Sequence, residues 1–238
     1  MQRPDWVFFD YGETLVHEEP FDHRRGSAKL LECAVENPRG LTVDDVCAVM
    51  LDITGYSKPV KYEMDIEVHS MDILRLASQL LGLRFHMPWE ELDEAYWEAA
   101  APGVAMPGAD ELLAYLEGAD IKTAIISNMG FTSNQLKHRL DKLLPGHEFA
   151  FIMTSSEYFF RKPGAMLFQA ALARAGAKTP WHVGDNVRCD IGGASAAGIF
   201  PVWVRHPGFA RTPDQPHAAV DGLRELIAMI ENCETKDR

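Results

Sequence analysis

Long apolar runs are absent from this sequence of 238 residues. No run approaches 18 apolar residues, and the first six residues contain no apolar core of a secretory signal. We therefore expect a soluble, cytoplasmic protein without a membrane partner. Cysteine is also scarce, and no pair has the Cys-x-x-Cys spacing of a zinc or redox site: the four are Cys33, Cys47, Cys189 and Cys233. Such scattered cysteines indicate reduced thiols rather than a disulfide framework.

Positive charge is in deficit. The chain has 23 Lys and Arg against 35 Asp and Glu, which gives a formal net charge of −12. This balance gives no reason to expect nucleic acid or an anionic membrane as a partner. It would also repel a small anionic substrate, so a site for one needs local positive charge or a metal ion. The sequence does not distinguish a monomer from a homodimer.

Short apolar runs alternate with helical patterns over most of the chain. The first run, Val7–Phe9, ends at Asp10, and from residue 106 onward strands and helices follow in turn. This alternation predicts an α/β fold with a Rossmann-like, doubly wound parallel sheet of about five strands. The expected strands cover residues 7–9, 123–126, 149–153, 181–184 and 201–204.

Residues 17–105 have a different character. Apolar residues recur there at helical spacing in four segments, 21–35, 42–53, 66–81 and 88–99, joined by short connections. The pattern predicts a small helical bundle inserted after the first strand. We therefore expect residues 1–16 and 106–238 to form the core, and residues 17–105 to form a cap over the carboxyl ends of the strands.

Polar residues stand at or just after the expected strand ends. They are Asp10 with Thr14, Ser127 with Asn128, Lys162, and Asp185 with Asp190. Each one alone is compatible with a helix cap, a turn or a solvated charge. Since the carboxyl ends of parallel strands form the ligand crevice of an open α/β sheet, their common placement indicates a single site.

In order and spacing, these groups resemble the four motifs of the haloacid dehalogenase superfamily. The first motif, Asp-x-Asp-Gly-Thr-Leu, corresponds to Asp10-Tyr11-Gly12-Glu13-Thr14-Leu15, and the second to Ile125-Ile126-Ser127-Asn128. The third corresponds to Arg161-Lys162-Pro163, and the fourth, Gly-Asp followed by another acid, to Gly184-Asp185 with Asp190. The resemblance covers nearly the whole chain, including a helical cap of the type inserted after the first motif.

The resemblance implies a Mg²⁺-dependent hydrolase in which Asp10 attacks phosphorus and forms an aspartyl-phosphate. Mg²⁺ would be bound by Asp10, Asp185 and the backbone carbonyl of Gly12, with Asp190 near the metal. The substrate would be a small phosphorylated metabolite. Its phosphoryl group would be bound by Ser127, Asn128 and Lys162, while Thr14 would stabilise the turn of the first motif.

One position departs from the family pattern. Phosphatases of the family carry an acid–base Asp two residues after the nucleophile, where this chain has Gly12. General acid–base catalysis contributes roughly 10²–10⁴-fold, so its loss should slow the hydrolysis of esters with poor leaving groups. Glu13 should point elsewhere if the turn is kept, and His17 is more typical of a surface histidine than of a replacement acid.

The glycine at position 12 leaves other functions than phosphate ester hydrolysis open. A non-catalytic or regulatory protein of the same fold would bind a phosphorylated ligand without turnover. Dehalogenases and phosphonate-cleaving relatives also lack this Asp, but the former need no metal site and the latter need a cap lysine. Lys29, Lys58 and Lys61 are available in the cap. The basic residues Arg24 and Arg25 at the start of the first cap helix could bind a substrate carboxylate or second phosphate.

Overall fold

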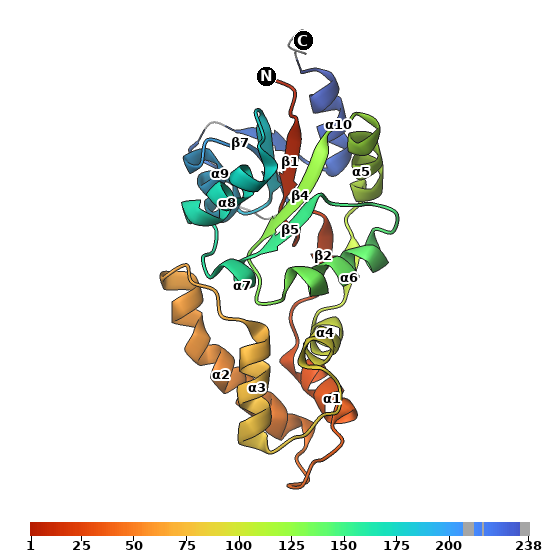
Figure 1. Ribbon diagram of the computed structural model, residues 1–238, viewed down its shortest axis with the longest axis vertical. Helices are drawn as coiled ribbons and strands as arrows, with labels where there is room; N and C mark the ends of the chain where they lie inside the picture. Colours follow the sequence, from red (N-terminus) through yellow and green to blue (C-terminus); the bar gives the residue numbers. More distant parts are fainter. Residues whose placement is uncertain (207–211, 216, 234–238) are drawn as a thin grey trace.

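The computed structural model describes residues 1–206, 212–215 and 217–233. It consists of an α/β core and a helical cap that extends from one end of the core (Figure 1). The two parts are joined by a two-stranded antiparallel sheet of β2 (Val16–Glu18) and β3 (Gly103–Ala105). This short sheet brings together the two points where the chain enters and leaves the cap.

The core contains a six-stranded parallel sheet with the order β5-β4-β1-β6-β7-β8. This confirms the predicted α/β fold and adds one strand to the expected five. The strands are β1 (Trp6–Phe9), β4 (Lys122–Ser127), β5 (Phe151–Thr154), β6 (Pro180–Gly184), β7 (Phe200–Val204) and β8 (Ala218–Val220). The sixth strand, β8, has only three residues, which is too short to give a periodic signal.

The central strand β1 is apolar on both faces because helices cover both sides of the sheet. Val7 and Phe9 lie in one hydrophobic cluster, and Trp6 and Phe8 lie in the other. One face is covered by α5 (Ala109–Gly118), α6 (Ser133–Leu143) and α10 (Leu223–Glu231). The other is covered by α7 (Ser155–Tyr158), α8 (Ala165–Ala175) and α9 (Gly193–Ala196), preceded by the π-helix η1 (Val187–Gly192).

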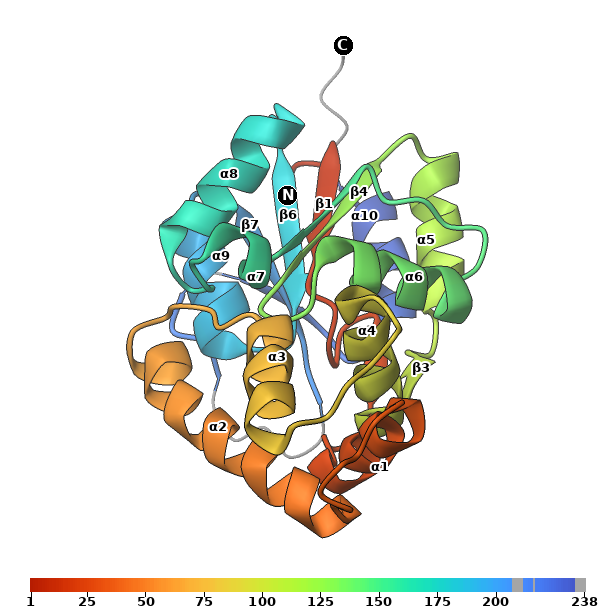
Figure 2. The same cartoon turned by 60° about the horizontal axis from the view of Figure 1, so that its bottom comes forward.

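The cap is a bundle of four helices with a hydrophobic core of its own (Figure 2). They are α1 (His23–Cys33), α2 (Val43–Glu63), α3 (Ser70–Leu81) and α4 (Trp89–Ala100). The predicted start of α2 is confirmed by a reciprocal capping box between Thr42 and Asp45. However, α2 continues past Pro59 to Glu63, ten residues beyond the apolar face that the sequence shows. No helix in the described part of the chain is long and apolar enough to cross a membrane.

The cap contacts the core along two edges. On one edge, α4 lies against α6, and the indole of Trp97 stacks on Phe131 with 4.2 Å between ring centroids. On the other edge, the segment after α2 forms an isolated antiparallel bridge, Ile66 with Phe160. Between these two edges the cap covers the carboxyl ends of the central strands.

Candidate active site

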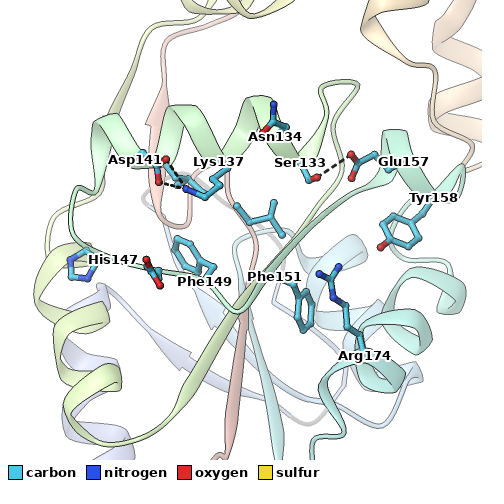
Figure 3. A pocket seen from close by; sticks show the side chains of 13 residues that line it. Ser133, Asn134, Lys137, Asp141, His147, Phe149, Phe151, Glu157, Tyr158 and Arg174 are labelled. Carbon is cyan, nitrogen blue, oxygen red and sulfur yellow. Dashed lines mark hydrogen bonds and ion pairs between the residues drawn. The ribbon is translucent and has the colours of Figure 1, made fainter.

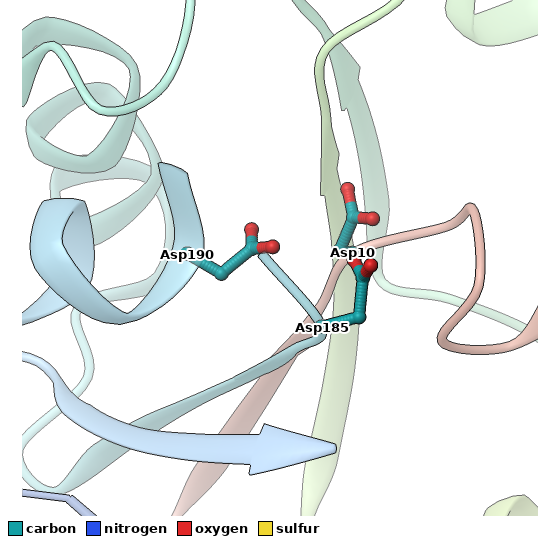
Figure 4. A group of neighbouring side chains, drawn as sticks. All are labelled: Asp10, Asp185 and Asp190. Carbon is teal, nitrogen blue, oxygen red and sulfur yellow. The ribbon is translucent and has the colours of Figure 1, made fainter. Parts of the chain in front are cut away.

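Three carboxylates meet at the carboxyl end of the sheet. Asp10 follows β1, Asp185 follows the adjacent strand β6, and Asp190 lies in η1 (Figure 4). One oxygen from each lies within 4.8 Å of the others. Burial and the charges of Asp10 and Asp190 raise the pKa of Asp185 to about 8. A cation between carboxylates held this close would favour their charged forms.

The Lys162 ammonium supplies part of that positive charge. Its Nζ donates to Asp10 Oδ1 at 2.6 Å, to Asp190 Oδ1 at 2.6 Å and to the backbone carbonyl of Ile126 at 2.8 Å. All three donors of the ammonium are therefore used. Burial opposes the charged form of Lys162, but the two carboxylates outweigh it and raise the pKa of the amine. The same contact opposes the upward shift that burial imposes on the pKa of Asp10.

Asn128 positions Lys162. Its side-chain Oδ1 accepts from the Lys162 backbone N–H at 2.7 Å, and its Nδ2 donates to the Lys162 carbonyl at 2.8 Å. Both halves of the amide are thus bonded to the backbone of one residue. The sequence predicted Asn128 as a substrate ligand, whereas its side-chain bonds fix the lysine. Ser127 ends β4 and lines the cavity above Asp10, which is described below. Its residue surface is 4% exposed.

Asp190 is held in place from several sides. Its Oδ2 accepts from the Asn186 backbone N–H at 3.0 Å, and its Oδ1 lies 2.9 Å from Nε2 of His182. Burial acts to raise its pKa, but Lys162 and His182 hold the pKa of Asp190 below its ordinary value. A Cβ at Gly184 would overlap the Asp190 side chain, which explains glycine at this position of the fourth motif.

His182 was not predicted as a site residue. It lies on β6, has no exposed surface, and burial lowers its pKa. A carboxylate only accepts hydrogen bonds, so Nε2 carries the proton toward Asp190, and Nδ1 is buried without a partner among the described residues. A polar residue within an otherwise apolar strand was the signal for it in the sequence.

The first-motif turn leaves Gly12 beside the cavity. The turn is closed by two hydrogen bonds to the Tyr11 carbonyl, from the N–H groups of Leu15 at 3.0 Å and Val16 at 3.1 Å. A Cβ added to Gly12 would meet no atom within 4 Å. Thr14 was expected to stabilise the turn, but its hydroxyl is buried and makes no hydrogen bond to the described residues.

Neither Glu13 nor His17 supplies the acid that is missing at position 12. Glu13 adopts a left-handed conformation, with φ of 52°, where the family pattern has glycine. Its carboxylate pairs with Nδ1 of His17 at 2.9 Å, on a surface where both side chains are about half exposed. Neither residue lines the cavity above Asp10.

That cavity has a volume of about 530 Å³ and lies between cap and core. Tyr11, Phe21, Trp97 and Phe131 form an aromatic wall, and Lys61, Arg161 and Arg188 form a basic wall. The predicted anion ligands Arg24 and Arg25 do not line it. Arg24 pairs with Asp44, and Arg25 pairs with Glu19 at 2.6 Å. These two arginines therefore belong to the cap surface.

A second hollow, of about 400 Å³, lies beside the edge strand β5 (Figure 3). Several of its charged side chains already have partners. Lys137 donates to Asp141 at 2.8 Å, and Glu157 accepts from Ser133 at 3.0 Å. It contains no cluster comparable to the three carboxylates, so the cavity under the cap is the candidate active site.

The carboxylate cluster fits a hard divalent cation. All its ligand atoms are oxygens, as Mg²⁺ prefers. Asp10 and Asp185 have oxygens available for such an ion, because Lys162 contacts only one oxygen of Asp10 and no side chain among the described residues donates to the Asp185 carboxylate. Both oxygens of Asp190 accept other hydrogen bonds, so it suits a supporting position.

Comparisons with known proteins identify the family of the chain. Residues 4–198 match the family described as haloacid dehalogenase-like hydrolase. The chain is 30% identical to the pyrimidine 5'-nucleotidase YjjG of Escherichia coli, over 95% of this chain and 97% of that protein. The chain therefore belongs to the haloacid dehalogenase-like hydrolases.

Two solved structures share the fold. A 2-haloacid dehalogenase from Pseudomonas syringae pv. tomato superposes with a TM-score of 0.65 at 20% identity, covering 97% of this chain and 98% of that one. YfnB of Bacillus subtilis, a putative hydrolase of the family, was solved bound to magnesium; it gives a TM-score of 0.60 at 19% identity and covers 97% of this chain and 100% of that one.

Proposed function

We propose that the protein is a Mg²⁺-dependent phosphomonoester hydrolase that uses Asp10 as its nucleophile. The observation that carries the proposal is the Asp10 carboxylate itself, held by Lys162 Nζ at 2.6 Å within a cluster of three acids at the floor of the cavity. The nucleotidase activity in the name of the E. coli relative supports phosphate esters as the substrate class.

The reaction has two displacements. In the first, an Asp10 oxygen forms a bond to phosphorus as the ester P–O bond breaks, and the leaving oxygen departs with the bonding electrons. In the second, a water oxygen attacks phosphorus and loses a proton to solvent, the P–O bond to Asp10 breaks with its electrons returning to the carboxylate, and phosphate leaves. Splitting the reaction in this way replaces one difficult step by two easier ones.

The site residues have separate roles in this scheme. A bound Mg²⁺ would supply Lewis-acid stabilisation of the phosphoryl oxygens and would be held by Asp10, Asp185 and the Gly12 carbonyl. Lys162 offsets negative charge on Asp10 and on the transferring group, and the Ser127 hydroxyl donates to a phosphoryl oxygen. Asp190, with His182 behind it, keeps the Lys162 ammonium in position.

The cap lysine Lys61 raises the alternative of phosphonate cleavage, because it lines the cavity. That chemistry requires a neutral amine to form a Schiff base. The Lys61 ammonium instead lies 3.2 Å from the buried Glu67 carboxylate. Lys61 is therefore already engaged in an ion pair, and phosphate ester hydrolysis remains the better-supported function. The other alternative is a protein that binds a phosphorylated ligand without turnover. An activity assay distinguishes it from a hydrolase.

The test is a screen of phosphate esters, including 4-nitrophenyl phosphate, with and without Mg²⁺. We expect turnover only with the metal. Asp185→Asn should weaken Mg²⁺ binding in calorimetry and lower the rate together, by about 100-fold or more, because it removes a charged ligand. The exposed Asp52→Asn is a control for charge. Turnover that is equally fast after metal removal would contradict the proposal.

A further inference from the structure

The basic wall of the cavity comes from three different segments. Lys61 lies in the last turn of α2, Arg161 directly precedes Lys162, and Arg188 lies in η1. Arg161 is therefore one peptide away from the lysine that contacts Asp10. None of its three residues belongs to the carboxylate cluster.

A buried carboxylate holds two of these cations in place. The Glu67 side chain has no exposed surface; it lies 3.2 Å from the Lys61 ammonium and forms an ion pair with Arg161. Ser155 Oγ also donates to it at 2.6 Å. The ring of Tyr62 lies under the Arg161 guanidinium at 5.6 Å. The two cations are thus fixed before any ligand arrives.

The wall has more positive charge than its own acids neutralise. Glu67 is shared by Lys61 and Arg161, while Arg188 pairs with Asp65 at 2.7 Å. Three cations therefore face two carboxylates, which leaves an excess of one positive charge in a protein of net charge −12. Among the described residues, the Arg161 guanidinium donates to a side chain only through Nη1, so its other N–H groups remain for a ligand.

We propose that this wall is a subsite for a second anionic group, a carboxylate or a second phosphate, on the organic part of the substrate. The inference rests on the proposed phosphatase function and specifies its substrate class. Arginine donates to carboxylate and phosphate in a bidentate geometry, and the contact is strong where water is restricted. Lys61 and Arg161 thus take the role that the sequence suggested for Arg24 and Arg25.

The test compares matched aryl phosphates. The 3- and 4-carboxyphenyl phosphates carry an anionic group at two spans, the corresponding carbamoylphenyl phosphates are neutral and of similar shape, and 1,4-phenylene bisphosphate carries a second phosphate. We expect kcat/KM to favour at least one anionic ester over its neutral partner by about tenfold to a hundredfold. The bisphosphate shows whether phosphate or carboxylate is preferred.

Variants of the wall should move this preference in opposite directions. Lys61→Gln removes one positive charge and should reduce the preference to within about threefold of unity. Glu67→Gln keeps the shape but removes the negative charge, and should increase the preference. Lys58→Gln, on the exposed side of the same helix and outside the cavity, is the matched control and should leave the preference unchanged.

Binding to the Asp10→Asn variant, measured by calorimetry with the same esters, separates the subsite from catalysis. If the esters bind with the charge preference but are not hydrolysed by the wild type, the subsite stands and the proposed function fails. Equal kcat/KM and equal affinity for charged and neutral esters would overturn the subsite while hydrolysis stands. Failure of both esters to bind would overturn it as well.

Discussion

Gly12 is the residue that sets the expected chemistry of this protein apart from its family pattern. An acid–base Asp at this position would protonate the leaving oxygen in the first displacement and deprotonate water in the second. Because Gly12 has no side chain, neither proton transfer has an acid or base from this position. Glu13 and His17 cannot compensate, because they pair with each other outside the cavity.

Gly12→Asp should restore part of this function. The position has no atom within 4 Å of a new Cβ and does not have a left-handed backbone, so the side chain fits without strain. We expect kcat for alkyl phosphates to rise by up to about 10²-fold. The rate constant of the first displacement should change far less for aryl phosphates.

The measurement is kcat/KM, which reports the first displacement, against the pKa of the leaving group for both proteins, with Gly12→Asn as the control of equal size. A steep dependence in the wild type should become shallow in Gly12→Asp. A dependence that is already shallow in the wild type would show that another side chain supplies the proton.

The sequence identified the residues whose place is fixed by the backbone. Asp10, Ser127 and Asp185 end or follow adjacent strands, so strand order alone brings them together. The hydrogen-bond and ion-pair partners of the side chains could not be predicted from the sequence. Asn128 binds the backbone of Lys162, and Arg24 pairs with Asp44, because of contacts between segments far apart in the chain.

At the scale of elements, the contact between α4 and α6 fixes the cap on the core. Asp93 of α4 is 1% exposed and accepts from Ser70 and, at 3.0 Å, from Gln135 of α6. The Gln135 amide also donates to the Glu90 carbonyl at 2.9 Å. Burial raises the pKa of Asp93 to about 6, although both hydrogen bonds oppose the shift.

This raised pKa predicts a pH dependence of stability. An unfolded Asp titrates near 3.9, so between about pH 4 and 6 the folded state retains a proton that the unfolded state has released. The contribution of Asp93 to the free energy of unfolding should therefore fall as pH rises through this window, by about 2–3 kcal/mol, and stay constant above it.

Urea unfolding of the wild type and Asp93→Asn at pH 4.5 and 7 measures this contribution. Relative to the variant, the wild type should be less stable at pH 7 than at pH 4.5. Asp52→Asn, exposed on α2, is the control for loss of one charge. A difference between wild type and Asp93→Asn that is the same at both pH values would contradict the assignment.

Elements with strong local signals were predicted, and those that depend on tertiary contacts were not. The capping residue Thr42 predicted the start of α2. The last ten residues of α2 include Pro59 and have no clear apolar face, so its end was not predicted. This extension carries Lys61 and Tyr62 to the cavity. The short strands β2, β3 and β8 have three residues each and exist because of their pairing partners.

At the scale of the whole molecule, the charge distribution and the missing acid act together. The net charge of −12 disfavours anions at the surface, while Lys162 and the basic wall place cations in a cavity that is also lined by carboxylates. The absence of an Asp at position 12 then affects the second displacement more than the first when the leaving group departs unprotonated. The phosphorylated form of Asp10 should therefore accumulate with such substrates.

Rapid acid quench with ³²P-labelled 4-nitrophenyl phosphate and Mg²⁺ detects a phosphorylated Asp10 directly. We expect a burst of nitrophenol close to one equivalent per site, with the label on the peptide that contains Asp10, stable in acid and released by hydroxylamine. The burst should shrink in Gly12→Asp and vanish in Asp10→Asn. Steady turnover with no burst and no label at Asp10, or label on another residue, would contradict Asp10 as the nucleophile.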